Sequence, residues 1–383
     1  MKKLFAAGFK KSILPFLLFF IFVGIKAQTT FTVSTLSTAS AGQGTKFQQL
    51  IQVRLRTYSR DLLNSLSFRL IGRDNIKSAR LYIGNPFYPW SYLYGTEISS
   101  FTNDTITFTG TGTETYDLNN DTYFNLVVEI KATATINQVV DAQCLSAVFN
   151  NSWSLTPANG NPNGDRKIVA PLSGTYTIKG AAGPNNFTKL SAAIDTLNRW
   201  GCTGGVTFVL QDDSVFAENF SGKYIYQTGS ATNRITFKRS GTGSAKPIVR
   251  PTATSSNDDA GFTLWSSDFV TIDGIVIDGP SITGQKVEFG IRLRNACDDG
   301  CQNITIQNCT IQLDSLQDSY CIYTNRNVVL TSTSGNNDKL KILNNVIKQA
   351  RWGIRLDNGN FSPFQEDSIV ISGNVISSIA INN

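Results

Sequence analysis

Gly290-Ile-Arg-Leu-Arg294, followed by Ile304-Thr-Ile-Gln-Asn-Cys-Thr-Ile311, is a pair of apolar phrases that recurs through the last third of this 383-residue chain. The first phrase occurs four times, at spacings of 29, 31 and 32 residues, and a second phrase follows each copy. Repeats of this length indicate stacked units, because one unit cannot bury its apolar face alone. The first-phrase copies start at Gly261, Gly290, Cys321 and Gly353, and the second-phrase copies at Val270, Ile304, Leu340 and Ile369.

Within the phrases, β-branched residues alternate at a period of two, which indicates strands and not helices. The second phrase supplies two strands joined by a bend and the first phrase a third strand, so each repeat predicts one coil of a β-helix. Two Asn in adjacent coils could share amide hydrogen bonds. The bend residues are Gly or Asn, which tolerate the left-handed backbone of a tight bend: Gly274, Asn308, Asn344 and Gly373.

A β-sandwich that continues past Asp165 is the alternative fold, but it does not explain four phrases in one register. The strand-rich composition agrees with either fold, since Thr, Ser, Asn, Gly, Ile and Val are abundant. Histidine is absent, which excludes His-based triads and His metal sites.

The N-terminal segment, Met1 to Ala27, has the pattern of a secretory signal peptide. Four lysines precede an apolar run, Ile13 to Ile25, that is short for a membrane span, and a retained anchor is the alternative. The segment holds five lysines and no acids, so the formal charge of +6 falls to +1 (6 − 5) in the mature chain. We therefore expect a secreted or cell-surface protein with no transmembrane segment after cleavage and no nucleic-acid partner.

The six cysteines could form disulfides in an exported chain. Cys297 and Cys301, with three residues between them in a predicted turn, are the candidate pair, and a Cys-only metal site is the alternative. Cys309 falls in an apolar phrase and could simply be buried. The pairing of the other cysteines stays open, namely Cys144, Cys202, Cys309 and Cys321.

Residues 28–155 predict an antiparallel β-sandwich, because short alternating strands are separated by turn residues. Residues 156–173 are rich in Pro, Gly and Asn and are predicted to form a linker. The predicted strands are 47–56, 66–70, 79–83, 105–108 and 123–130.

The pattern of this region is similar to a small domain at the N-terminus of BNR-repeat neuraminidases. That resemblance implies an accessory domain that brings no catalytic residues. The Asp-box motif of the neuraminidase propeller (Ser-x-Asp-x-Gly-x-x-Trp) is absent, so sialidase activity is not carried over. The resemblance rests on the runs Ala39–Ile51, Ser65–Phe68, Ala79–Tyr82, Tyr123–Ile130 and Asp141–Cys144.

One helix, residues 188–200, is predicted at the start of the solenoid region, 174–383. Thr188 is the expected N-cap, with Ala192 as a small staple partner, and Gly201 suits the C-terminal cap. We expect the helix to cover the open end of the stack, as solenoids require. Its apolar stripe consists of Phe187, Leu190, Ile194 and Leu197.

The order strand, short helix, strands and repeats resembles the entry to secreted right-handed parallel β-helices of the pectin-lyase-like type. The residues that carry it are Gly174–Ile178, Gly205–Phe208, Asn233–Phe237 and Val270–Ile275. The fold class expected is therefore all-β, an antiparallel sandwich followed by a right-handed single-stranded parallel β-helix. This fold does not imply one function, since lyases, hydrolases, adhesins and inert spacers share it.

Alternation in the first phrase sends two side chains per coil inward and two outward. Adjacent coils lie about 4.8 Å apart, so the outward residues form a continuous strip. Aromatic rings and Arg forks suit sugar rings and acidic sugar groups, and by resemblance this face would hold a substrate cleft. The candidate ligand-binding residues, here termed the predicted strip, are Trp265, Arg292, Arg294, Tyr323, Asn325, Arg355 and Asp357, with Thr263 beside them.

Several functions stay open for this strip. The leading expectation is an exported protein that binds extracellular polysaccharide or cell-surface glycan, as an adhesin or otherwise. The alternatives are a polysaccharide lyase or hydrolase acting on acidic polysaccharides, and a structural spacer whose outward residues only face solvent. A lyase would need a base, Arg292 or Arg355, and a cation such as Ca²⁺ held by carboxylates.

No residue is assigned a catalytic role by the sequence. Asp298-Asp299 superficially resembles the paired aspartates of polygalacturonases, but the accompanying Gly-His-Gly cannot exist without histidine. The acidic turns where Ca²⁺ could bind contain Asp258, Asp259, Asp298, Asp299, Asp314, Asp318, Glu366 and Asp367. The last residues, Ser378–Asn383, align with the start of a fifth first phrase, so we expect the chain to be a fragment that continues beyond Asn383.

Overall fold

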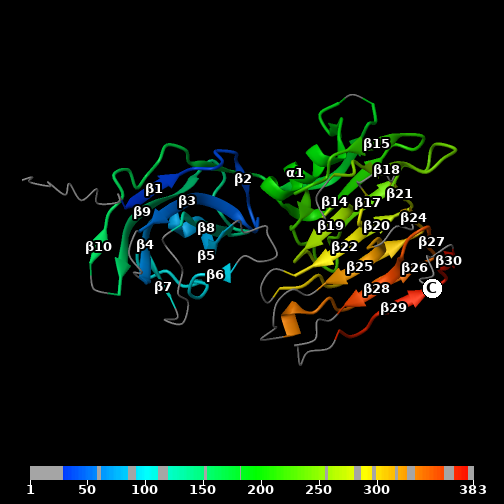
Figure 1. Cartoon of the computed structure of the whole chain (residues 1–383). Helices are drawn as coiled ribbons and strands as arrows, with labels where there is room; N and C mark the ends of the chain where they lie inside the picture. Colours follow the sequence, from blue (N-terminus) through cyan, green and yellow to red (C-terminus); the bar gives the residue numbers. More distant parts are fainter. Residues whose placement is uncertain are drawn as a thin grey trace, which may run out of the picture.

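The computed structural model describes residues 29–57, 62–84, 92–110, 120–150, 153–181, 183–254, 258–279, 286–295, 299–314, 318–325, 333–357 and 366–377. These residues form an antiparallel β-sandwich followed by a parallel β-solenoid (Figure 1). The all-β fold class predicted from the repeats is confirmed. The predicted signal peptide and Ser378–Asn383 lie outside the described residues.

The sandwich consists of two sheets whose inward side chains form one core. Apolar residues alternate with polar ones along its long strands, which explains why the alternating segments were recognisable in the sequence. The first sheet has the order β1 (Thr30–Ser34), β3 (Gln48–Arg56), β8 (Thr122–Ile130), β5 (Ile76–Ile83) and β6 (Tyr92–Leu93). The second has the order β2 (Ala41–Gly42), β11 (Arg166–Val169), β9 (Val139–Phe149), β4 (Leu63–Ile71) and β7 (Thr105–Thr109), and β10 (Ser154–Leu155) pairs with β9.

The predicted linker, residues 156–173, differs from the prediction at its second half. Strand β11 lies within it and pairs antiparallel with β9 and parallel with β2. The Arg166 side chain is buried and donates to the Gln49 carbonyl at 3.0 Å. Composition alone could not show this, because it does not reveal pairing with segments elsewhere in the chain, such as Ala41, which pairs with Ile168.

The solenoid has three parallel sheets, and each coil contributes one strand to each sheet. The first sheet contains β13 (Asn186–Phe187), β12 (Leu172–Ile178), β14 (Cys202–Leu210), β17 (Ile235–Arg239), β20 (Val270–Asp273), β23 (Thr305–Gln307), β26 (Lys341–Leu343) and β29 (Val370–Ser372). The second contains β15 (Val215–Glu218), β18 (Ile248–Pro251), β21 (Val276–Asp278), β24 (Thr310–Gln312), β27 (Val346–Lys348) and β30 (Val375–Ser377). The third contains β16 (Tyr224–Ile225), β19 (Ala260–Trp265), β22 (Phe289–Arg294), β25 (Tyr320–Asn325) and β28 (Trp352–Asp357).

The bend between the first and second sheets has the predicted left-handed backbone in four coils. The φ angles are 71° at Gly274, 54° at Asn308, 54° at Asn344 and 67° at Gly373. Only Gly, Asn and Asp adopt this conformation at low cost, which explains the residue choice.

The amide ladder forms one residue after the predicted position. Asn345 Nδ2 donates to Asn374 Oδ1 at 2.9 Å, and Asn345 Oδ1 accepts the amide of Cys309 at 2.9 Å. Asn345 is fully buried, so these bonds satisfy groups that water cannot reach. The bend residue Asn308 instead donates outward to Asp273 Oδ1.

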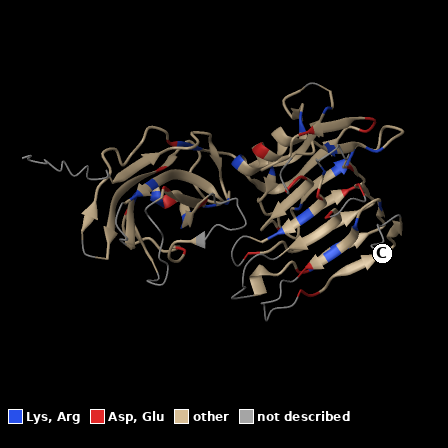
Figure 2. Ribbon diagram, in the orientation of Figure 1, with Lys and Arg blue, Asp and Glu red and all other residues tan. Residues whose placement is uncertain are grey.

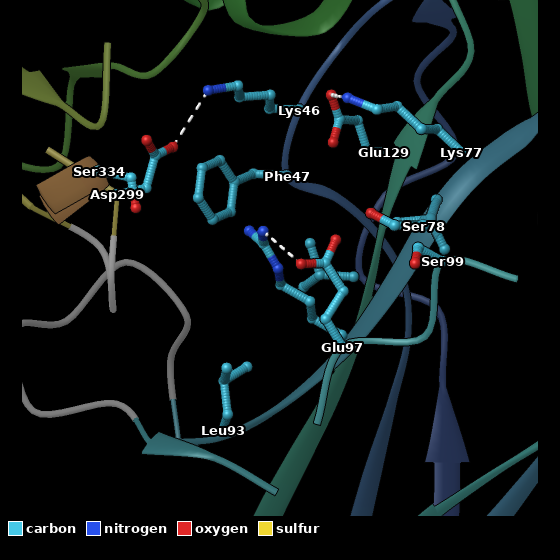
Figure 3. A pocket seen from close by; sticks show the side chains of 13 residues that line it. Lys46, Phe47, Lys77, Ser78, Leu93, Glu97, Ser99, Glu129, Asp299 and Ser334 are labelled. Carbon is cyan, nitrogen blue, oxygen red and sulfur yellow. Dashed lines mark hydrogen bonds and ion pairs between the residues drawn. The ribbon is translucent and has the colours of Figure 1, made fainter. Parts of the chain in front are cut away.

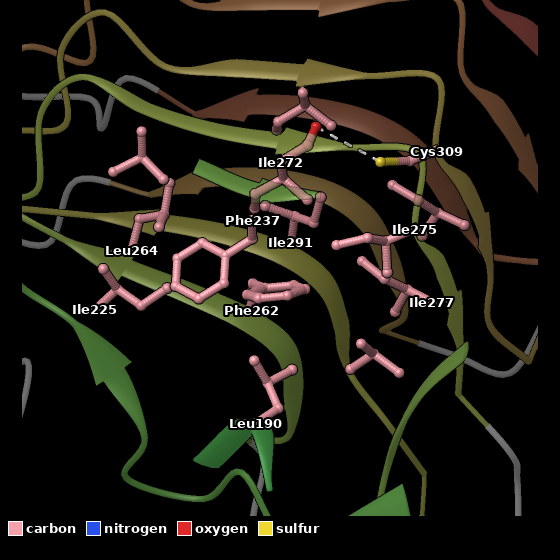
Figure 4. Close-up of a cluster of buried hydrophobic side chains, with 14 of the residues drawn as sticks. Leu190, Ile225, Phe237, Phe262, Leu264, Ile272, Ile275, Ile277, Ile291 and Cys309 are labelled. Atoms are coloured by element: carbon pink, nitrogen blue, oxygen red, sulfur yellow. Dashed lines mark hydrogen bonds between the residues drawn. The ribbon is translucent and has the colours of Figure 1, made fainter. Parts of the chain in front are cut away.

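The solenoid interior is filled by apolar side chains from all three sheets and from the helix (Figure 4). Phe237 stacks on Phe208 of the preceding coil, with ring centroids 4.9 Å apart, and lies near Phe262 of the third sheet. Each such buried side chain contributes about 1.5–3 kcal/mol of hydrophobic free energy.

Helix α1 (Leu190–Trp200) packs its predicted stripe onto this core, with Leu190, Ile194 and Leu197 buried. Gly201 ends the helix at φ 65° and donates its amide to Leu197 O. The predicted N-cap is wrong: Lys189 occupies that position and makes no side-chain cap. Glu218 of β15 caps the helix instead, because its carboxylate accepts the amides of Leu190 at 2.9 Å and Ser191 at 3.0 Å.

Two short 3₁₀ turns complete the described secondary structure, Arg73–Asn75 and Thr333–Gly335. Across the described ranges, no helix combines the length and hydropathy needed to cross a bilayer.

Candidate functional site

The outer face of the third solenoid sheet carries the predicted strip in the predicted register. Thr263, Arg292, Tyr323 and Arg355 pair in successive coils, and so do Trp265, Arg294, Asn325 and Asp357. Figure 2 marks basic segments within β22 and β28 of this face. The sequence therefore placed all seven residues on one face of adjacent strands.

Exposure divides the predicted strip into two halves. Trp265 is 3% exposed and Arg294 1%, and Arg292 and Tyr323 are also buried. The predicted exposed strip is thus wrong for its first half. Trp265 is covered because it belongs to one buried cluster with Phe47, Tyr82 and Val127 of the sandwich, and its ring lies 5.0 Å from that of Tyr224.

The second half remains open to solvent. The side chains of Arg355 and Asp357 are 39% and 32% exposed, and Asn325 is half-buried. We term this surface the open strip and define it by Tyr320, Asn325, Trp352, Arg355 and Asp357. The buried ring of Tyr323 lies next to them, 5.8 Å from the Arg355 guanidinium.

A row of aromatic rings that the alternation rule missed borders the open strip. Phe289, Tyr320 and Trp352 pair in successive coils and stack nearly parallel, at interplanar angles of 15° and 6°. These rings lie on the outer face because the alternation is interrupted: Gly290 and Ile291 are consecutive and both face inward, so the residue before Gly290 faces outward. Gly290 faces the core, since a Cβ there would meet Ile311 Cγ2 at 2.5 Å. An aromatic residue just before Gly290, Cys321 and Gly353 was the available sequence signal.

Arg355 is the central cation of the open strip. Its guanidinium lies over the rings of Trp352, Tyr320 and Tyr323, at 5.4, 5.6 and 5.8 Å from their centroids. It also donates to Asp357 Oδ2 at 2.9 Å. Cation–π contact and ion pairing hold the guanidinium in place while part of it faces solvent.

The buried half of the face has its own charge cluster around Asp258. That carboxylate accepts hydrogen bonds from Arg292, from Arg294 and from the Tyr224 hydroxyl. Burial lowers the pKa of Arg294 to about 10, with repulsion from Arg292 as the next cause. Arg292, one of the two candidate bases, is 7% exposed and has its guanidinium 4.2 Å from the Phe289 centroid, so it is not placed to reach a substrate.

Two buried carboxyl groups lie at the starting edge of the third sheet. Asp259 donates its backbone amide to Glu288 Oε2 at 3.1 Å, and both residues are at most 3% exposed. Burial raises the pKa of Glu288 to about 7, and the charge of Asp259 contributes. Asp259 Oδ2 accepts from the Thr254 amide and hydroxyl.

Three further acidic turn residues pair with side chains from other segments of the chain. Asp299 pairs with Lys46 at 3.1 Å, Asp318 with Arg351 at 2.9 Å, and Glu366 Oε1 accepts from Asn337. Among the described residues, no three Cys, Asp or Glu side chains converge to hold a metal ion.

Among the described residues, Cys144, Cys202, Cys309 and Cys321 are free thiols. Cys309 is buried as expected, and its Sγ lies 3.7 Å from Ile272 O in the core (Figure 4). Burial raises the pKa of Cys301 and Cys321 to about 12, which makes both poor nucleophiles. Cys297 lies outside the described residues, so its pairing with Cys301 stays a prediction.

Comparison with known proteins gives no family model and no curated protein that matches this chain. Among solved structures, the Hadza microbial sialidase Hz136 is similar over 36% of this chain and 31% of its own, at 12% identity and a TM-score of 0.30. A cohesin of scaffoldin B from Acetivibrio cellulolyticus matches 37% of this chain and 99% of its own, at 12% identity and a TM-score of 0.23.

The catalytic domain of a GH87 α-1,3-glucanase in complex with nigerose matches 91% of this chain and 73% of its own, at 10% identity and a TM-score of 0.20. Because these TM-scores lie below 0.5, none of the similarities supports an inference about the activity of this chain. The chain also spans less than a third of the length of the sialidase.

Proposed function

We propose that this chain is an exported protein that binds glycans outside the cell through the open strip. The observation that carries the proposal is the position of Arg355, which lies over three aromatic rings, pairs with Asp357 and stays partly exposed. Rings offer apolar surface for sugar C–H groups, and the Arg–Asp pair offers both donors and acceptors for hydroxyls. Export is proposed from the pattern of residues 1–27, and an adhesin is one form that such a protein would take.

The experiment is a glycan array with the purified chain and two variants. Arg355→Ala removes the central cation, and we expect it to weaken binding by at least about tenfold, equivalent to ~1.4 kcal/mol. The matched control is Arg250→Ala, because Arg250 is 40% exposed and also ion-paired, with Asp278, but lies on the second sheet. Equal binding by wild type and Arg355→Ala, or equal losses in both variants, would reject the open strip as the site.

A polysaccharide-cleaving enzyme is the second candidate function. The neighbouring carboxyl groups of Asp259 and Glu288 favour it, although both residues are at most 3% exposed, so a substrate would have to open this edge of the third sheet to reach them. A carboxylic acid whose pKa lies near 7 is a usable general acid at neutral pH. Incubation with uronate and neutral polysaccharides tests this, with absorbance at ~235 nm for an unsaturated lyase product and reducing ends for hydrolysis. Product that disappears in Glu288→Gln would support cleavage; binding without product supports the first proposal, and neither supports a structural spacer.

A further inference from the structure

A cavity of about 520 Å³ lies between the sandwich and the solenoid and shares no residue with the open strip. Strands β5 and β8 of the sandwich form one wall, and Asp299 and Ser334 of the solenoid close the opposite side (Figure 3). This volume is in the range of small-molecule sites, roughly 300–1,000 Å³. The sandwich therefore also forms a partly open cavity with the solenoid.

The cavity is preformed, because its rim segment is fixed by both domains. The side chain of Gln227, in the solenoid, forms two hydrogen bonds with the backbone of Lys46, in the sandwich. Gln227 Nε2 donates to the Lys46 carbonyl at 3.3 Å, and the Lys46 amide donates to Gln227 Oε1 at 3.2 Å. Phe47 has a φ of 54°, a left-handed backbone that costs a bulky residue about 1–2 kcal/mol. The surroundings enforce it, since the Phe47 ring packs between Tyr82 of the sandwich and Tyr226 of the solenoid.

The charged groups that line the cavity neutralise one another in pairs. Lys46 pairs with Asp299 at 3.1 Å, and Arg80 pairs with Glu97 at 2.8 Å. At the rim, Lys77 and Glu129 form a third pair at 2.9 Å. Although burial opposes its ionisation, hydrogen bonds from Ser78 and Arg80 lower the pKa of Glu97, so this acid is charged at neutral pH.

This arrangement favours a neutral ligand with many hydroxyl groups. A charged ligand would have to displace one member of an ion pair, which leaves a partly buried charge without its partner. Hydroxyl groups accept from ammonium and guanidinium groups and donate to carboxylates, all of which keep spare capacity when paired once. Phe47, Leu93 and Val127 add apolar surface on the same lining, which suits the C–H face of a sugar ring.

We propose that this interdomain cavity binds a neutral mono- or oligosaccharide. The site is separate from the open strip and does not depend on the function proposed for that strip. The two surfaces differ in position, since the cavity lies between the two domains, whereas the open strip lies on the outer face of the third solenoid sheet.

The experiment is a calorimetric titration of the whole chain with galactose, N-acetylglucosamine, lactose and chitobiose as probes, and with glucuronate as a charged probe. We expect saturable binding of at least one neutral probe, and binding of glucuronate at least about tenfold weaker. Ser99→Trp fills the cavity from its exposed rim and should abolish binding. Ser100→Trp is the matched control, because Ser100 is the exposed neighbour and does not line this cavity.

A second measurement on the wild type covers the case in which Ser99→Trp fails to fold. Hydrogen exchange with the bound probe should slow at amides of β5 and β8. No saturable binding, binding retained in Ser99→Trp, or slowed exchange in the third solenoid sheet alone would overturn the proposal. Arg355→Ala should leave cavity binding unchanged, so failure of the open-strip function and failure of the cavity site give different results.

Discussion

Glu218→Ala is the sharpest test of how the solenoid is closed at its N-terminal end. The Glu218 carboxylate accepts two backbone amides and the Ser191 hydroxyl at the first turn of α1, although it belongs to a strand 27 residues further along the chain. Removing it leaves two amides of the first turn without an acceptor and removes a negative charge from the positive end of the helix dipole.

The size of the effect follows from these two losses. A lost cap costs about 1 kcal/mol, and the lost charge interaction about 0.3–1 kcal/mol, so we expect about 1.3–2 kcal/mol in total. This corresponds to a decrease in Tm of about 3–8 °C for a unit of this size. Calorimetry measures the Tm, and hydrogen exchange at Leu190 and Ser191 should accelerate in the variant, because these amides lose their acceptor.

Thr188→Ala is the matched control, since Thr188 is the cap that the sequence predicted. It is exposed, and the helix N-terminus carries no side-chain cap from its own segment, so its removal should change the free energy of unfolding by less than about 0.5 kcal/mol. The reasoning is refuted if Thr188→Ala costs as much as Glu218→Ala, or if neither variant alters exchange at the first turn.

Three further perturbations test the interior. Phe237→Ala should lower the free energy of unfolding by about 3–5 kcal/mol in a urea titration, because the ring is fully buried and stacked on Phe208; a loss below 1 kcal/mol would mean that this core is not packed as described. Asn345→Ala should cost about 2–3 kcal/mol, since it removes the acceptor of the buried Cys309 amide and the side-chain donor to Ile306 O, whereas an unchanged midpoint would reject the ladder. The pKa of Glu288 is raised to about 7 from a usual 4.5, so between these pH values the folded state holds a proton that the unfolded state releases. The free energy of unfolding should therefore fall as pH rises from about 4.5 to 7, and Glu288→Gln should flatten that dependence. A pH profile identical in both proteins would contradict the assignment.

Local sequence determined the solenoid and the register of its strip. The period-two alternation and the choice of residue at a positive-φ bend depend only on neighbouring residues in the sequence. Gly274 and Asn308 could therefore be recognised as bends without knowledge of any distant partner. The pairing of Arg292 with Tyr323 and Arg355 follows directly from the repeat spacing, because adjacent coils must stack in register to bury their apolar faces. The stripe of α1 was equally visible, since Leu190, Ile194 and Leu197 recur at helical spacing.

Only the tertiary structure decided which of these residues are exposed to solvent and which group caps the N-terminus of α1. Trp265 and Arg294 point outward as predicted, but the sandwich covers Trp265, and no pattern in residues 261–383 could reveal a domain that packs from elsewhere in the chain. Glu218 replaces Thr188 as the helix cap for the same reason, because hydrogen bonds between distant segments leave no local periodicity. The physical reason is general: periodicity reports the direction of a side chain from its own backbone, whereas exposure and capping depend on what other parts of the chain bring to it.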